Sequence, residues 1–221
     1  MLLLRSMSDA PSQNSALERR FLSEPPDAPD ILLFYINRPS VIVGRNQRIE
    51  AEVDVACCRE EGIEVFRRIS GGGAVYQDYG NINYAFICGK TDVSCLDADF
   101  AAPIREALRA FGITATVGKR KELLADGRKI SGTASHVTRN RILFHGTLLH
   151  RTDLGRMSRA LRGDPDLRGR RIASVPSPVV NLSDLTGDSE PTTAFLEKLL
   201  LFFEGRYGVK SVTLTLQDQL P

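Results

Sequence analysis

The chain has no tryptophan, three histidines and four cysteines among its 221 residues. The cysteines are Cys57, Cys58, Cys88 and Cys95, so none occurs in the second half of the chain. The adjacent pair lacks the C-x-x-C spacing that is typical of zinc and redox sites. Because no secretion signal is evident, we expect four reduced thiols that pack as small apolar side chains.

Long apolar runs and a strong net charge are also missing. No run approaches the roughly 18–20 residues that a helix needs to cross a bilayer. The opening segment 1–7 is too short for the apolar region of a signal peptide. The net charge of +2 is too small to indicate nucleic-acid binding. These absences predict a cytoplasmic protein that uses neither a membrane nor a nucleic acid as partner.

Strand-like and helix-like segments interleave along the chain without a fixed repeat. Strands are predicted over residues 31–36, 41–43, 65–69, 74–76, 84–88, 141–149 and 212–216. Helices are predicted over residues 14–23, 51–61, 100–111, 154–161 and 192–205. The pattern favours an α/β (α+β) fold, a mixed sheet backed by helices, and lacks the sustained βαβ alternation of a doubly wound fold.

Helix ends carry their own signals. Asn14 or Ser15 is expected to cap the first helix with Glu18 behind it, and Asp153 to cap the fourth. Glycines at 62 and 112 are expected to end two further helices.

The most informative segment reads R-R-I-S-G-G-G-A-V-Y at residues 67–76. Glycine allows a positive φ and a close approach of ligand to backbone, and the paired guanidinium groups of Arg67 and Arg68 suit a carboxylate or phosphate. The alternative is a flexible hairpin turn with no ligand. The segment lacks both the Gly-Lys-Ser/Thr of a P-loop and the G-x-G-x-x-G of a dinucleotide-binding turn.

Two further segments carry chemistry. D-G-R-K-I-S-G-T-A at residues 126–134 places Lys129 after a turn, as an anion ligand or as a solvated surface charge. F-H-G-T-L-L at residues 144–149 places His145 in an apolar strand, as a site residue or as a hydrogen-bonded core residue. A concentration of arginine at 162–171 is interpreted as a solvated or ligand-facing loop.

In this order and spacing, the three motifs resemble those of the lipoate–protein ligase A family. V-G-R-N-Q at 43–47 and S-V-P-S-P-V-V-N-L-S-D-L at 174–185 also match, so the resemblance runs from about residue 14 to 208. It implies the mixed, mostly antiparallel sheet of a biotin/lipoyl ligase (class II aminoacyl-tRNA synthetase-like) catalytic domain. It further implies that residues 1–221 form one such domain, without the C-terminal accessory domain of long bacterial ligases.

The resemblance also implies an activity. Family members use ATP and Mg²⁺ to convert lipoate to lipoyl-AMP, and then pass the lipoyl group to a lysine. The acceptor is a lipoyl domain of a 2-oxoacid dehydrogenase acyltransferase or the glycine-cleavage carrier protein. Lys129 is the implied catalytic residue, and Asn46 and Asn83 are weaker wall candidates. The implied nucleotide- and lipoate-binding residues are Arg68, Ser70, Gly71, Gly72, Gly73, Ala74, Val75, Tyr76, Asn81, Lys129, Ser131, Gly132, His145 and Gly146.

The chain departs from the family pattern at two positions. Gln77 stands where the family usually has histidine, and Lys121-Glu122 replaces an Asn-Asp pair near the metal and phosphates, which leaves the metal ligands undefined. Alternatives to a complete ligase are a lipoyltransferase that uses preformed lipoyl-AMP and a catalytic subunit that needs an accessory subunit. A cysteine-dependent octanoyl or lipoyl transferase, a non-catalytic binding subunit and a biotin ligase are more remote.

Overall fold

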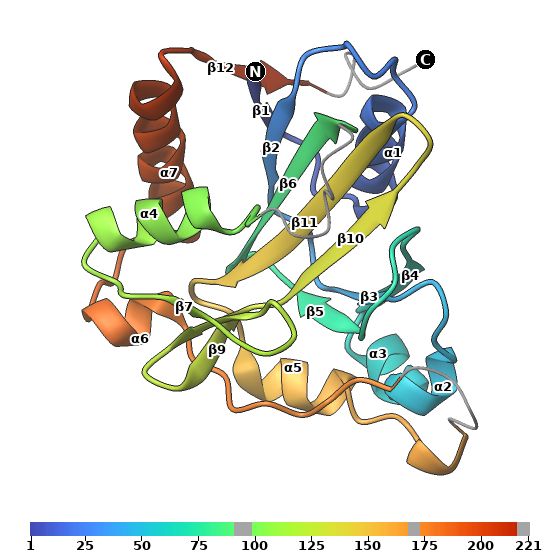
Figure 1. The fold of residues 1–221 in the computed structure, drawn as a ribbon. Helices are drawn as coiled ribbons and strands as arrows, with labels where there is room; N and C mark the ends of the chain where they lie inside the picture. Colours follow the sequence, from blue (N-terminus) through green and yellow to red (C-terminus); the bar gives the residue numbers. More distant parts are fainter. Residues whose placement is uncertain (91–98, 168–172, 216–221) are drawn as a thin grey trace.

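A six-stranded mixed sheet forms the centre of the computed structural model, which describes residues 1–90, 99–167 and 173–215 (Figure 1). Its strand order is β10-β11-β6-β2-β1-β12. β1 is parallel to both of its neighbours, and the other pairs are antiparallel. The strands are β1 (Leu2–Ser6), β2 (Ile31–Tyr35), β6 (Asn81–Gly89), β10 (Thr133–Val137), β11 (Arg141–Leu149) and β12 (Ser211–Leu214).

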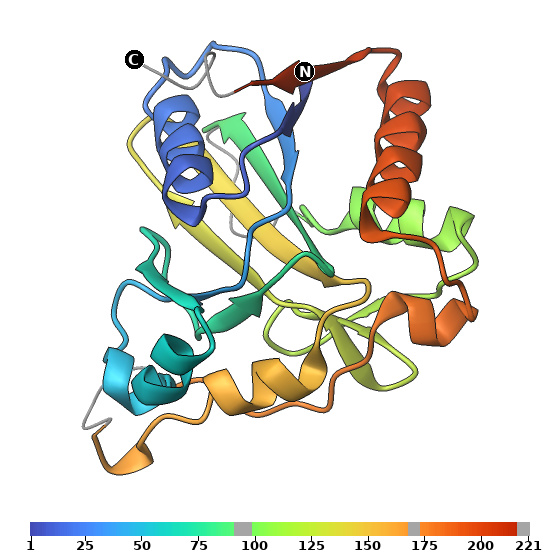
Figure 2. The same cartoon turned by 180° about the vertical axis from the view of Figure 1, so that it is seen from behind.

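Helices cover both faces of this sheet, which explains why its central strands are buried and mostly apolar. α4 (Ala102–Ala110) and α7 (Thr192–Tyr207) pack on one face and bury Ile104, Leu199 and Phe203. α1 (Pro11–Leu22) packs on the other, where Leu17 and Phe21 meet β2, β6 and β11 (Figure 2).

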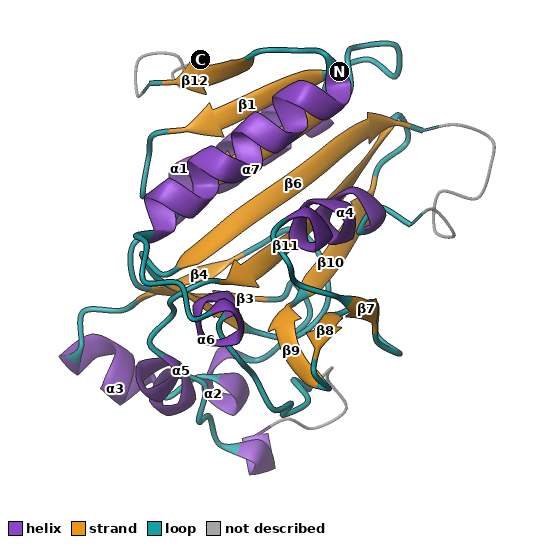
Figure 3. Ribbon diagram, turned by 90° about the vertical axis from the view of Figure 1, so that its left-hand side faces the viewer, coloured by secondary structure: helices purple, strands orange, loops and turns teal. Residues whose placement is uncertain are grey.

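A smaller sheet lies beside the large one and has its own apolar cluster (Figure 3). In it β3 pairs with β4 in parallel and with β5 in antiparallel fashion. Short helices α2, α3 and α5 accompany it. The bounds are β3 (Ser40–Val43), β4 (Glu64–Arg67), β5 (Val75–Gln77), α2 (Ile49–Glu52), α3 (Val55–Glu60) and α5 (Leu154–Ala160).

A third, three-stranded sheet completes the molecule. Its order is β7-β8-β9, and α6 and one 3₁₀ turn lie in the connections that follow. The bounds are β7 (Thr116–Val117), β8 (Leu123–Ala125), β9 (Arg128–Ser131), the 3₁₀ turn Pro165–Leu167 and α6 (Leu182–Thr186). Among the residues that the structure describes, no helix has the length and apolar character needed to cross a membrane.

The predicted mixed sheet flanked by helices is confirmed, and so is the cap of α5, where Asp153 accepts a hydrogen bond from the Arg156 N–H. Two element predictions were wrong. The first helix begins at Pro11, whose ring suits a first helical position, so Asn14 and Ser15 lie inside it. The predicted helix over 51–61 is split in two, because Val53 and Asp54 are extended and Asp54 caps α3. β1 was not predicted at all.

Candidate functional site

A cavity of about 390 Å³ lies where α1, the large sheet, the small sheet and the β8–β9 hairpin meet. Residues 173–175 and 177 form a further wall. Nine of the predicted site residues line it, which brings all three sequence motifs together: Arg68, Gly72, Gly73, Ala74, Val75, Lys129, Gly132, His145 and Gly146.

The glycine loop is held in shape by Arg68. This buried guanidinium donates to the carbonyls of Ile42, Gly71 and Gly73 at 2.9, 2.6 and 2.8 Å, and to Ser70 Oγ at 2.8 Å. Its burial lowers the pKa of Arg68 to about 10. Most of the donors of Arg68 thus bind Ser70 Oγ and backbone carbonyls, and the expected contact of Arg68 with an anion stays a prediction.

Arg67 is used in a similar way. Its guanidinium donates to the carbonyls of Gly44 and Gln47 at 2.9 and 2.8 Å. The paired arginines thus hold two loops by their carbonyl groups. What the loop offers a ligand is close approach to its backbone: Gly72 has a φ of 85° and no Cβ. The Ala74 N–H is already used, since it donates to Ser174 Oγ at 2.9 Å.

Lys129 stands on the opposite wall, where β9 is joined to the segment after residue 177. Its backbone N–H donates to the Pro178 carbonyl at 2.7 Å, and its carbonyl accepts from the Val180 N–H at 3.1 Å. Burial lowers the pKa of the ammonium group, and the Glu122 carboxylate on the same wall opposes that shift. A partly desolvated cation of this kind binds an anion more strongly than a solvated surface lysine does.

His145 connects the glycine loop to α1. Ser70 Oγ, which accepts from Arg68, lies 2.7 Å from His145 Nε2. The other ring nitrogen, Nδ1, donates to Glu18 at 3.0 Å, because a carboxylate can only accept. Glu18 also accepts from the Tyr35 hydroxyl at 3.0 Å. Burial raises the pKa of Tyr35, and the negative charge of Glu18 raises it further.

The remaining predicted residues lie off the described cavity wall. Ser70 and Gly71 act through their hydrogen bonds to Arg68. The Tyr76 ring packs in the small-sheet cluster, and the contact expected of its backbone stays a prediction. Ser131 is buried against the Tyr84 hydroxyl, and the buried Asn81 side chain donates to Asn83.

Of the two weaker candidates, Asn83 lines the cavity, whereas Asn46 is exposed and lies off the described wall. Glu122, noted from the sequence beside the metal and phosphates, also lines the cavity. Several other wall residues were not predicted, namely Ser15, Glu18, Tyr35, Asn37, Thr147 and Ser174. Glu18 was interpreted only as part of a helix start, and the 3.6-residue period of α1 would have placed it on the same face as Asn14 and Leu22.

Among the described residues, no cysteine lines the cavity and no group of three His, Cys, Asp or Glu side chains could hold a metal ion. Cys57 and Cys58 are free thiols, as expected, and burial raises the pKa of Cys58 to about 11. Such a thiol is a poor nucleophile. Cys95 and the arginine-rich end of 162–171 lie wholly or partly outside the described residues.

The fold and the site define a catalytic domain, and comparison identifies its family. Residues 10–204 match the model of the lipoyl protein ligase A/B catalytic domain. The chain belongs to this family.

Relatives of known structure or name agree with that assignment. Lipoate-protein ligase LplJ of Bacillus subtilis is 38% identical over 86% of this chain and 58% of its own length. A crystal structure of lipoate-protein ligase A bound with ATP has a TM-score of 0.80 at 26% identity, covering 99% of this chain and 90% of that one.

The fold is shared more widely. A bi-partite lipoate protein ligase of Thermoplasma acidophilum, described with its E2 lipoyl domain, has a TM-score of 0.77 at 24% identity, over 99% of this chain and 88% of that one. The chain spans only 58–64% of the length of the curated relatives that it matches first.

Proposed function

We propose that this chain is the catalytic domain of an ATP-dependent lipoate–protein ligase. The observation that carries the proposal is the Lys129 ammonium group, which is partly desolvated and lines the same cavity as the glycine loop. Family membership and the ATP-bound relative support the same assignment. Lipoate and ATP are the proposed substrates.

The first proposed step forms an acyl-adenylate. A lipoate carboxylate oxygen attacks the α-phosphorus of ATP, the bond to the bridging oxygen breaks, and pyrophosphate leaves. Two anions must approach each other, so the cation of Lys129 lowers the barrier by offsetting their repulsion. Gly72 and Gly73 let the phosphate approach the backbone closely.

The second proposed step transfers the acyl group. A carrier lysine amine attacks the carbonyl carbon of lipoyl-AMP, the bond to the phosphate oxygen breaks, AMP leaves, and the amine loses a proton. Lys129 remains beside the phosphate and stabilises the leaving AMP.

Magnesium, when bound, would neutralise charge on the phosphates. Glu122 places one carboxylate on the cavity wall. Mg²⁺ is typically bound by one or two carboxylates together with phosphate oxygens of the substrate. Glu122 therefore fits an ion that enters the site bound to ATP.

The proposed acceptor is a lipoyl domain of a 2-oxoacid dehydrogenase acyltransferase or the glycine-cleavage carrier protein. The T. acidophilum ligase described with its E2 lipoyl domain supports the first of these. A cytoplasmic location, a single domain over residues 1–221 and a separate accessory subunit remain predictions from the sequence.

Substitution of Lys129 tests the proposal. We expect Lys129→Ala to release pyrophosphate from ATP and lipoate at least about 100-fold more slowly than the unaltered chain, since one lost charge-stabilising donor costs about 10²–10³ in rate. Lys210→Ala, at an 89% exposed side chain, is the matched control and should keep the full rate.

The same assay separates the alternatives. Undiminished pyrophosphate release by Lys129→Ala contradicts the assignment of Lys129. Release by the unaltered chain alone contradicts the need for an accessory subunit. Transfer from synthetic lipoyl-AMP without pyrophosphate release would instead identify a lipoyltransferase.

A further inference from the structure

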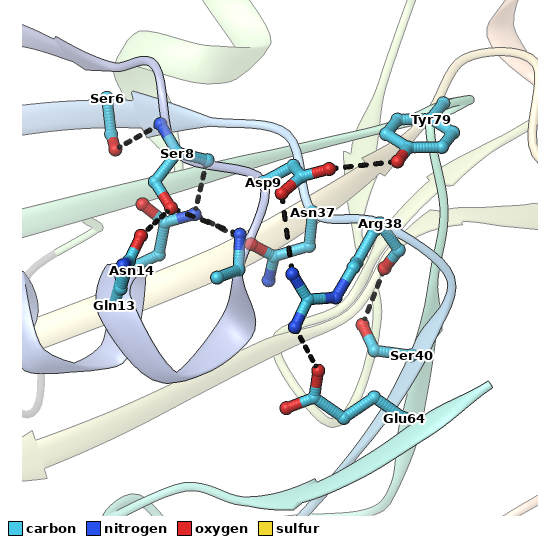
Figure 4. Close-up of polar contacts among 11 residues, drawn as sticks. Ser6, Ser8, Asp9, Gln13, Asn14, Asn37, Arg38, Ser40, Glu64 and Tyr79 are labelled. Carbon is cyan, nitrogen blue, oxygen red and sulfur yellow. Dashed lines mark hydrogen bonds and ion pairs between the residues drawn. The ribbon is translucent and has the colours of Figure 1, made fainter. Parts of the chain in front are cut away.

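Three buried side-chain amides stand in a row between α1 and the cavity. Asn14 lies in α1, Asn37 follows β2, and Gln77 ends β5. None of the three is more than 5% exposed. Asn14 Nδ2 is 2.7 Å from Asn37 Oδ1, and Asn37 Nδ2 is 2.6 Å from Gln77 Oε1. Figure 4 shows the Ser8, Asn14 and Asn37 part of this row, next to the exposed group around Arg38 and Tyr79.

The contact between Asn14 and Ser8 fixes the donor and the acceptor of every hydrogen bond in the row. Asn14 Nδ2 also donates to the Ser8 backbone carbonyl at 2.8 Å, and a carbonyl can only accept. Asn14 must therefore present its NH₂ group to Asn37, which accepts through its oxygen and presents its own NH₂ group to Gln77. Reversing any amide would set two oxygens or two NH₂ groups against each other.

Gln77 is consequently a donor toward the cavity. Its oxygen is occupied by Asn37, so its Nε2 group carries the free hydrogens. The side chain lies on the cavity wall, and within the described ranges Nε2 donates to no protein acceptor. Nε2 is not among the buried polar atoms left without a partner, so its hydrogens are open to the cavity and can donate to an acceptor on a ligand.

The position of Gln77 along the cavity indicates which part of a ligand it meets. Val75 and Gln77 point to the same face of β5, about 7 Å apart, because side chains alternate along a strand. Val75 lies beside Gly132, which in turn adjoins the Lys129 ammonium group. Gln77 binds Asn37, which follows the buried Tyr35 by two residues, and both line the cavity. Arg120, Val175 and Ser177, which also line it, are exposed.

We propose that Gln77 is a specificity-determining residue that selects acyl chains with a hydrogen-bond acceptor near their far end. With the carboxylate at Lys129, the buried end of the cavity receives the tail of the acyl group. The ring sulfur atoms of lipoate are weak acceptors, and the methyl end of octanoate is none. The chain should therefore favour lipoate over octanoate through this amide, an inference that rests on the proposed function.

Calorimetric titration of the whole chain with lipoate, octanoate and 7-oxooctanoate tests the inference. The ketone of 7-oxooctanoate accepts hydrogen bonds and donates none. Gln77→Met keeps the length of the side chain and removes the donor. We expect it to lose about 3- to 10-fold in affinity for lipoate and 7-oxooctanoate, and less than about twofold for octanoate. Gln77→His, which restores a ring N–H, should recover part of the loss.

Two further variants keep the test decisive. Ile42→Val, at another cavity-lining position, should weaken all three ligands alike. If Gln77→Met does not fold, Asn37→Asp at pH 8 replaces it. The new carboxylate still accepts from Asn14 but attracts the Gln77 NH₂ group away from the cavity, so the same ligands should lose affinity.

Three results would count against the inference or its basis. Equal losses for all three acids overturn it, because Gln77 then acts only on the shape of the cavity. A loss of ATP affinity with unchanged acid affinities also overturns it, because Gln77 then faces the nucleotide. An unaltered chain that binds none of the acids contradicts the proposed function instead.

Discussion

His150 is a buried imidazole directly after β11, and its surroundings keep it neutral. Its Nδ1 is 3.1 Å from Thr192 Oγ1, and its ring stacks on Phe195 with centroids 4.6 Å apart. Burial lowers the pKa of His150 to about 4, whereas an unfolded histidine titrates near 6.5. Between these values the unfolded chain binds a proton that the folded chain does not. The free energy of unfolding should therefore fall as the pH is lowered through this window, by about 3 kcal/mol for this residue.

Urea unfolding at a series of pH values measures that effect. His150→Gln can keep a hydrogen bond to Thr192 but cannot titrate, so its unfolding free energy should vary much less between pH 6.5 and 4. His136→Gln, on β10, is the matched control and should keep most of the slope. An unchanged slope in His150→Gln would show that other groups cause the pH dependence.

Residue types in the motifs could be predicted to form a site, but their partners could not. Arg68 was selected because guanidinium groups bind anions, and the structure instead gives it loop carbonyls and Ser70. Nothing in the local sequence distinguishes these outcomes, because the choice depends on Ile42 and on how the loop folds back. Lys129 kept its predicted place because it follows a tight turn on a short strand.

At the scale of elements, the strand β11 depends on a glycine. A Cβ at position 146 would overlap the Tyr84 hydroxyl of the neighbouring strand β6. Gly146→Ala should therefore lower the free energy of unfolding by about 1–3 kcal/mol, as overpacked core positions do. A Cβ added at Gly205 in α7 would meet nothing within 4 Å, so Gly205→Ala should raise the free energy of unfolding by about 0.5–1 kcal/mol.

Chemical denaturation of the two alanine variants measures this difference in sign. The comparison controls for the substitution itself, since both replace glycine by alanine. Equal stabilities of Gly146→Ala and the unaltered chain would mean that β6 and β11 can separate without cost, contrary to the packing described.

Elements were predictable where one signal dominates. The mostly apolar run of β11 and the Asp153 cap of α5 are local signals, and both were predicted. The contribution of α1 to the site was not, because Glu18 and His145 are 127 residues apart and meet only after the sheet has formed. β1 was missed for the same reason: its partners, β2 and β12, lie 29 and more than 200 positions away.

At the scale of the whole molecule, several parts of the fold meet at the cavity. Its walls come from α1, the large sheet, the small sheet, the β8–β9 hairpin and the segment after residue 172. A ligand that fills it contacts each of these at once, so binding should stabilise the fold as a unit. At a ligand concentration 100 times the dissociation constant, the gain is about 2.7 kcal/mol.

Thermal or urea unfolding with increasing lipoate measures this linkage. The midpoint should rise with the logarithm of the lipoate concentration for the unaltered chain, and it should rise much less for Lys129→Ala, which lacks the cation for the carboxylate. Amide exchange at Lys129 and Val180 adds a local check, because their hydrogen bonds join β9 to the segment over the cavity and should open more rarely with ligand bound. Equal midpoint shifts in both proteins would place the acid outside this cavity, since its carboxylate would then be held without Lys129.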